Sequence, residues 1–258
     1  MLNGWQDLVL IVMTVFAALL LMLVLNRIWP REKRRAHNDL IGWQLSILGT
    51  MYAVIVGFML YTVWTNFGVA SENADNEANA IVNLHRLAVG LPAEQAVKMK
   101  ELAQDYADAV VDREWGMMAA GKISPESSQI SRKMWSTLMS IQSPSPTQIT
   151  AEDHSLYELS TLTEHRQMRQ LQITSRLPAI LWSVLLAGGA LTIFSVCLFG
   201  TQSALIHGIQ VFSFSLLVAM ALIAIADIDR PFQGTVHVSD AAFRRAQINM
   251  LPLVAPQP

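Results

Sequence analysis

The chain has 258 residues, of which 52% are hydrophobic and only 15% are charged, and its formal net charge at pH 7 is −2. Because ordinary soluble domains carry roughly 25% charged residues, this composition indicates long apolar segments. The near-neutral balance excludes a global basic field, and we expect no nucleic-acid partner.

The first predicted element is an apolar helix over residues 8–26, LVLIVMTVFAALLLMLVLN. It is long enough to cross a hydrocarbon core of about 30 Å. A cleaved signal peptide carries positive charge before its apolar run, whereas here the basic residues follow the run. The sequence therefore predicts a retained membrane anchor.

A basic loop over residues 27–39 follows, and its cluster of cations consists of Arg31, Lys33, Arg34 and Arg35. Short cytoplasmic loops collect Lys and Arg, so the cluster predicts a cytoplasmic loop, with residues 68–177 and the C-terminal tail outside. Dispersed arginines near the opposite membrane ends, such as Arg176 and Arg230, argue against this orientation. Binding of anionic lipid is a second interpretation of the cluster, and it is compatible with the same location.

Three further windows, residues 40–67, 178–199 and 205–225, are long and apolar enough to cross a bilayer. One such window could be the core helix of a soluble protein, but four together indicate a protein embedded in the lipid bilayer. The predicted fold is all-α, with four transmembrane helices in two hairpins. We expect a first hairpin at residues 1–67, a helical extramembrane domain at 68–177, a second hairpin at 178–229 and an extramembrane tail at 230–258.

The segment between the hairpins is predicted to be helices joined by turns. Amphipathic patterns cover residues 93–115, 124–142 and 150–176, with start signals at Pro92, Ser124 and Thr150. Asp153 would complete a capping box with Thr150. The helix of the second span has no strong breaker before Gly90, so we expect it to extend well beyond the bilayer.

The remaining connections are predicted from their turn residues. SPSPTQ, residues 143–148, is expected to form a turn or short linker, and Pro178 to mark the boundary before the third span. In the tail, Ser239 is a candidate cap of a last short helix. Residues 251–258 are expected to be loose.

Small residues recur at every fourth position in the second predicted span. They form two rows, Gly42, Ser46 and Thr50, and Gly49, Ala53 and Gly57. Rows of this kind permit close contact between transmembrane helices. Packing within one chain is one explanation, but two rows on neighbouring faces also favour a subunit contact, and we expect a homo-oligomer.

Acidic and amide side chains follow the second span. The candidate pore-mouth residues are Glu72, Asp75, Asn76 and Asn79. Glu72, Asn76 and Asn79 share one helix face, because their spacings are four and three residues. In an oligomer this face could ring a pore mouth and select small ions by charge; the alternative is a solvated helix face.

The sequence carries no enzyme signature. Its six histidines form no metal-binding spacing, and it has neither a phosphate-binding glycine loop nor a GxSxG elbow. The single cysteine, Cys197, excludes an intramolecular disulfide and a multi-cysteine metal site. We therefore expect no catalysis, no cofactor and no metal site.

Four stretches together resemble the bestrophin-like family of bacterial and plant membrane proteins. They are RRAHND (34–39), GTMYAVIVGFMLYTVW (49–64), NEANAIVNLHRLAVGLP (76–92) and DRPFQGTVHVS (229–239). The resemblance implies a relation to bestrophins, which are oligomeric, chiefly anion-selective channels with four spans per subunit and a helical domain between the hairpins. Bestrophins keep that domain in the cytoplasm, whereas the basic loop here predicts the reverse. No aromatic constriction motif or calcium-clasp cluster can be transferred residue by residue.

Two functional hypotheses follow. In the first, the protein is an oligomeric channel that passes ions across the cell membrane, and its second span lines the path. The acidic residues favour cations and the resemblance favours anions, so the selectivity stays open. In the second, the protein is a non-conducting scaffold or sensor whose helical extramembrane domain binds a partner or ligand.

Overall fold

The computed structural model describes residues 4–142 and 145–251, and the chain forms two compact units. The first unit contains residues 1–66 and 176–229, and the second contains residues 67–175 and 230–258. Throughout the described ranges the regular structure is helical, without any strand, which confirms the predicted all-α class. The second half of the expected linker at 143–148 proves helical from Pro146 onward, while residues 143–144 and 252–258 lie outside the described residues.

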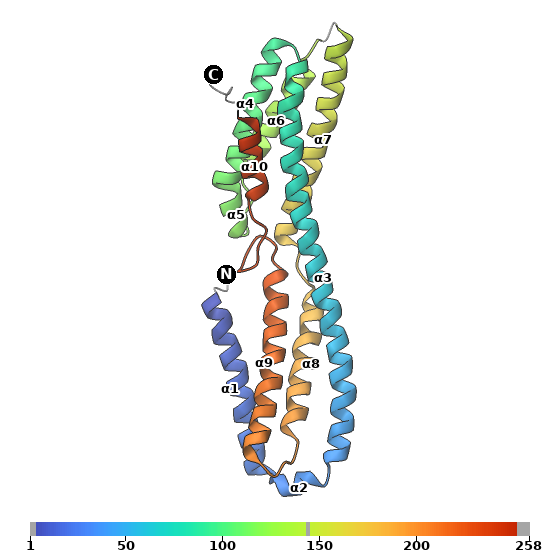
Figure 1. The fold of residues 1–258 in the computed structure, drawn as a ribbon, viewed down its shortest axis with the longest axis vertical. Helices are drawn as coiled ribbons and strands as arrows, with labels where there is room; N and C mark the ends of the chain where they lie inside the picture. Colours follow the sequence, from blue (N-terminus) through green and yellow to red (C-terminus); the bar gives the residue numbers. More distant parts are fainter. Residues whose placement is uncertain (1–3, 143–144, 252–258) are drawn as a thin grey trace, which may run out of the picture. The chain divides into compact units, whose positions relative to one another are not determined.

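The first unit contains α1 (Gly4–Ile28), the short α2 (Arg31–Arg35), the first part of α3 (Asn38–Leu87), α8 (Ala179–Cys197) and α9 (Ala204–Ile228) (Figure 1). The long helices α1, α3, α8 and α9 are long and apolar enough to cross a membrane, which confirms the four predicted spans. Helices α1, α8 and α9 pack against one another. A Pro178 N-cap precedes α8, as the sequence predicted, and Ser203 caps α9 by accepting a hydrogen bond from the Ile206 amide at 3.4 Å.

Helix α2 is fixed against the turn between α8 and α9. Arg34 is fully buried, and its Nη1 donates to the Cys197 carbonyl oxygen at 2.7 Å, while Nη2 bonds Asn26. The Asn38 side chain forms two hydrogen bonds of 2.9 Å with the backbone of Gly200. One guanidinium and one amide therefore satisfy backbone groups that the end of α8 leaves unpaired.

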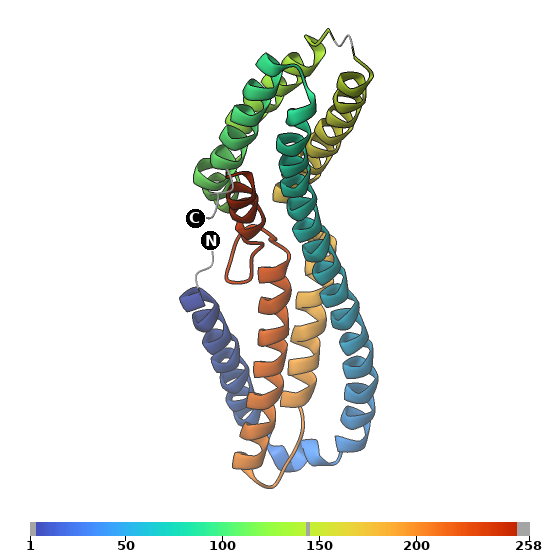
Figure 2. The same ribbon diagram turned by 45° about the horizontal axis from the view of Figure 1, so that its top comes forward.

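The second unit contains the rest of α3, the 3₁₀ turn η1 (Ala88–Gly90), α4 (Ala93–Ala109), the π-helical turn η2 (Val110–Glu114), α5 (Trp115–Ala119), α6 (Glu126–Met139), α7 (Pro146–Thr174) and α10 (Ala241–Met250) (Figure 2). Helix α3 is a single helix of 50 residues, so the predicted extension beyond the span is confirmed. The core is apolar and includes Tyr106, Met134, Leu159 and Phe243. Helix α10 packs on α4, so the described part of the tail belongs to this unit.

Three helix starts differ from the sequence prediction. The N-cap of α6 is Pro125 rather than Ser124, although the Ser124 hydroxyl accepts from the Glu126 amide at 3.3 Å. The predicted start at Thr150 is wrong, because Ser145 caps α7 by accepting from the Gln148 amide at 3.3 Å and Pro146 occupies the first turn. The N-cap of α10 is Asp240 rather than Ser239, although the Ser239 hydroxyl accepts from the Ala241 amide at 3.4 Å. For α6 and α10 the N-cap is the residue after the predicted one, and for α7 it lies five residues before the predicted start.

The contact at Gly200 gives a stability prediction. An added Cβ would lie 2.5 Å from the Arg31 carbonyl oxygen and 2.6 Å from the Arg35 amide nitrogen, so Gly200→Ala must displace the backbone of α2. We expect a loss of about 1–3 kcal/mol, which thermal unfolding of the detergent-solubilised protein would measure. Gly208→Ala is the matched control, because an added Cβ there meets nothing within 4 Å. Equal melting temperatures for the two variants would contradict the tight contact.

Candidate functional site

Within the first unit, α3 is attached to its own chain along one narrow stripe. Its buried residues there are Ile41, Tyr52 and Val63, which are spaced by eleven residues and therefore share one face. The Tyr52 ring lies over the backbone of α8, where an added Cβ at Gly188 would be 2.6 Å from a ring carbon. The absence of side chains at Gly188 and Gly189 thus lets the Tyr52 ring pack directly on α8.

The predicted rows of small residues lie outside that stripe. Ser46, Thr50 and Ala53 are exposed, and an added Cβ at Gly49 or Gly57 would meet nothing within 4 Å. Gly42 is the exception within the two rows, because its added Cβ would lie 3.6 Å from the Phe199 ring. Packing inside the chain therefore explains one end of the rows and leaves the rest uncovered.

A groove of about 710 Å³ runs along the uncovered small residues. It is lined by Leu45, Ser46, Gly49, Thr50, Ala53 and Val54 of α3 and by Phe214 of α9. The hydroxyls of Ser46 and Thr50 donate to carbonyl oxygens of their own helix at 2.9 and 2.8 Å. Their oxygens keep acceptor capacity, so the wall is apolar with single polar points.

The candidate pore-mouth residues separate into two groups in the second unit. Glu72 and Asn79 are exposed and Asn76 is half-buried on one side of α3. Asp75 points elsewhere, because its carboxylate pairs with Arg245 of α10 at 3.0 Å. The carboxylate of Glu72 is thus the acidic group of this set without an ion-pair partner among the described residues.

The sequence prediction missed the buried charged network on the other side of α3. Both oxygens of Glu77 accept from Arg169 of α7, at 2.7 and 2.8 Å, and one also accepts from the Tyr106 hydroxyl at 2.6 Å. All three side chains are fully buried. A signal was available, since Glu77 occupies the apolar stripe of Ala70, Ala74, Ile81 and Leu84 at heptad spacing.

The network extends from Arg169 to a second carboxylate. Glu114 lies 3.3 Å from Arg169 and 3.8 Å from Arg166, and it accepts a hydrogen bond from Ser127. Two arginines therefore balance two carboxylates. The guanidinium of Arg169 also lies 5.5 Å from the centre of the Trp115 ring.

Burial and charge set the protonation states in this network. Burial raises the pKa of Tyr106 well above its ordinary value, and the neighbouring Glu77 carboxylate raises it further. Burial alone would lower the pKa of Arg169, but the carboxylates of Glu77 and Glu114 outweigh that effect and raise it. Tyr106 therefore stays a hydrogen-bond donor and Arg169 stays a cation throughout the physiological pH range.

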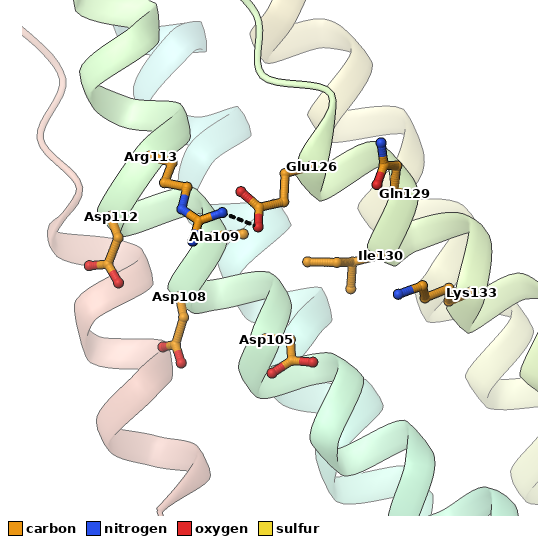
Figure 3. Close-up of a pocket in the computed structure, with 9 residues that line it drawn as sticks. All are labelled: Asp105, Asp108, Ala109, Asp112, Arg113, Glu126, Gln129, Ile130 and Lys133. Atoms are coloured by element: carbon orange, nitrogen blue, oxygen red, sulfur yellow. Dashed lines mark hydrogen bonds and ion pairs between the residues drawn. The ribbon is translucent and has the colours of Figure 1, made fainter.

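A shallow acidic pocket of about 320 Å³ lies between α4, η2 and α6 (Figure 3). Its carboxylates come from Asp105, Asp108, Asp112 and Glu126. Glu126 is paired with Arg113 at 2.5 Å, and Asp108 accepts from Gln247 at 2.6 Å. Across residues 4–142 and 145–251 we find no group of three or more His, Cys, Asp or Glu residues arranged to hold a metal ion.

These features define a class of protein, an all-helical integral membrane protein with four transmembrane helices and a helical segment between two hairpins. Residues 12–243 match the family model described as the Bestrophin-like domain. The chain therefore belongs to the bestrophin-like family, as the four motifs suggested. No curated protein matches the chain significantly.

Solved structures share the fold. A bacterial Bestrophin homolog from Klebsiella pneumoniae superposes with a TM-score of 0.70 and 14% identity, covering 96% of this chain and 100% of that chain. A single-substitution variant of it gives a TM-score of 0.69 with 14% identity and coverage of 93% and 97%. A structure described as a membrane protein gives 0.68 with 14% identity and coverage of 96% and 100%.

The buried network gives a second stability prediction. Arg169→Met leaves Glu77 and Glu114 buried without their main counter-charge, so we expect a loss of roughly 3–5 kcal/mol. Arg113→Met removes an ion pair whose arginine side chain is 67% exposed, so it should cost less than about 1 kcal/mol. Thermal unfolding of both variants tests the difference, and similar losses would show that the buried network is not needed for stability.

Proposed function

We propose that the protein forms a homo-oligomer in the cell membrane and passes small ions along α3. The observation that carries the proposal is the uncovered row of small residues on α3, beside a groove of about 710 Å³. Lipid is as apolar as the side chains, so a membrane helix gains most by close packing of small residues against another helix. A neighbouring subunit would supply that helix.

The path that we propose follows the hydroxyl-bearing row of α3, next to the row of Gly49, Ala53 and Gly57 that would pack against the neighbouring subunit. Ser46 and Thr50 would offer oxygen atoms to a partly hydrated ion. Beyond the span, Glu72 with Asn76 and Asn79 would place repeated charge and amide groups around the mouth in each subunit. Asp75 would act indirectly, by fixing α10 through Arg245.

The boundaries and orientation remain part of the proposal. Residues 68–177 and the tail would be extramembrane, and the basic loop 27–39 would be cytoplasmic. Membership of the bestrophin-like family supports the channel-like function, while the charge at Glu72 favours cations and the bestrophin relation favours anions. The proposal therefore does not specify whether the channel selects cations or anions.

The oligomer can be tested at Gly57. We expect Gly57→Trp to prevent close helix contact and to weaken self-association by at least about tenfold, because small-residue faces tolerate no bulk. Val12→Trp on α1 is the control, since Val12 is also an exposed apolar residue of a spanning helix. Light scattering in mild detergent measures the mass, and an unchanged oligomer in the Gly57 variant would contradict the proposed interface.

Conduction can be tested at Glu72. The purified protein in liposomes should pass ions, and Glu72→Gln should lower the ratio of cation to anion flux by roughly twofold or more at low salt. Glu101→Gln, another exposed carboxylate in the second unit, should leave the ratio unchanged. Flux equal to that of empty liposomes, from correctly inserted oligomers, would contradict the channel and favour the scaffold or sensor.

A further inference from the structure

Most of the basic residues in the loop 27–39 make no ion pair within the described part of the chain. Residues 27–39 contain five arginines and lysines and two acidic residues, so their formal charge is +3. Of these five cations only Arg34 is buried, and its guanidinium is already hydrogen-bonded to the Cys197 carbonyl oxygen at the end of α8. Arg27, Lys33 and Arg35 are exposed and Arg31 is half-buried, and none of the four has an ion-pair partner among the described residues.

These cations are held in place rather than carried on a loose loop. The Arg34 bonds, the Asn38–Gly200 pair and the contact of Gly200 with the α2 backbone fix both sides of α2. Within the first unit, α2 lies at the end where α1, α8 and α9 finish or begin (Figure 1). An exposed charge that stays unpaired on a fixed helix presents a constant surface to a ligand.

The depth of these basic residues in the bilayer can be inferred from the residues on either side of them. Helix α1 carries no charge from Leu8 to Leu25 and ends at Ile28, and α3 becomes apolar from Leu40. Trp29 and Trp43 are exposed on either side of the basic residues. Exposed tryptophans concentrate at the level of the lipid headgroups, so the cations lie at the same level.

We infer that α2 and the end of α1 form a docking surface for the headgroups of anionic membrane lipids, with Arg31, Lys33 and Arg35 binding the lipid phosphate and Arg27 contributing from α1. The ligand is a lipid of the surrounding bilayer rather than a soluble anion, because the exposed Trp29 and Trp43 flank the cations in the sequence and favour the headgroup level of a bilayer. Since Arg34 caps α8, bound lipid would stabilise the junction of α2 with the second hairpin. This inference does not depend on conduction.

The test measures lipid binding to the full-length protein in mild detergent. Native mass spectrometry and thermal unfolding would be followed while phosphatidylglycerol, phosphatidylcholine or glycerol phosphate is added. We expect phosphatidylglycerol to bind and raise the melting temperature, with weaker binding at high salt, and the other two to have little effect. In the triple variant R31Q/K33Q/R35Q, which keeps Arg34, the affinity for phosphatidylglycerol should fall at least about tenfold.

The control removes three exposed cations elsewhere, in the variant R86Q/K98Q/K122Q, and should bind like the wild type. If the triple variant does not fold, Lys33→Gln alone, at an exposed site, should still lower the affinity severalfold. Three results would overturn the inference: affinity in the basic-site variant within about twofold of the wild type, equal binding of phosphatidylcholine, or equal stabilisation by glycerol phosphate.

Discussion

Transmembrane helices have little to gain from hiding apolar side chains from lipid, and this constraint shapes the whole first unit. Each helix satisfies its own backbone, so contact between helices depends on fit. The fit is visible where Tyr52 of α3 lies over Gly188 and Gly189 of α8. No such contact forms along Gly49, Ala53 and Gly57, where α3 presents small residues that no other part of the described chain covers.

The second unit is stabilised mainly by the burial of apolar side chains, which contributes little between helices in lipid. There, water drives Tyr106, Met134 and Phe243 into a shared core, and burial is the main stabilising term. Among the described residues of this core the buried charges form one set, in which Arg169 pairs with both Glu77 and Glu114. One helix, α3, takes part in both regimes, and its sequence changes from glycine and hydroxyl rows to alanines with a buried glutamate.

Much of this architecture could be predicted from the sequence, because hydrophobic length and helical period are local properties. The four spans and the long extension of α3 follow from residues 8–26, 40–67, 178–199 and 205–225 and from the lack of a breaker before Gly90. The arrangement of the candidate pore-mouth residues could be predicted only in part. Helical spacing grouped Glu72 with Asn76 and Asn79, but the pairing of Asp75 with Arg245 joins positions 170 residues apart.

Long-range partners account for the other differences as well. Arg34 looked like one more topology-determining cation, and only the folded chain reveals the carbonyl oxygen of Cys197 that it meets. Glu77 stood visibly in an apolar stripe, yet its partner on α7 had no sequence signal that distinguished it from Arg166. The start of α7 was misplaced because Ser145 and Pro146 form a better start than Thr150.

The π-helical turn at Val110–Glu114 has a consequence for the rod formed by α4 and α5. A turn of this kind accommodates one residue more than an α-helical turn, so every later side chain is rotated by about 100° around the axis. That rotation is what brings Glu114 inward and lets the Trp115 indole bond the Val238 carbonyl. Deletion of one residue there would keep the segment helical but rotate the residues that follow, which would turn Glu114 toward water and break the bond between the Trp115 indole and Val238.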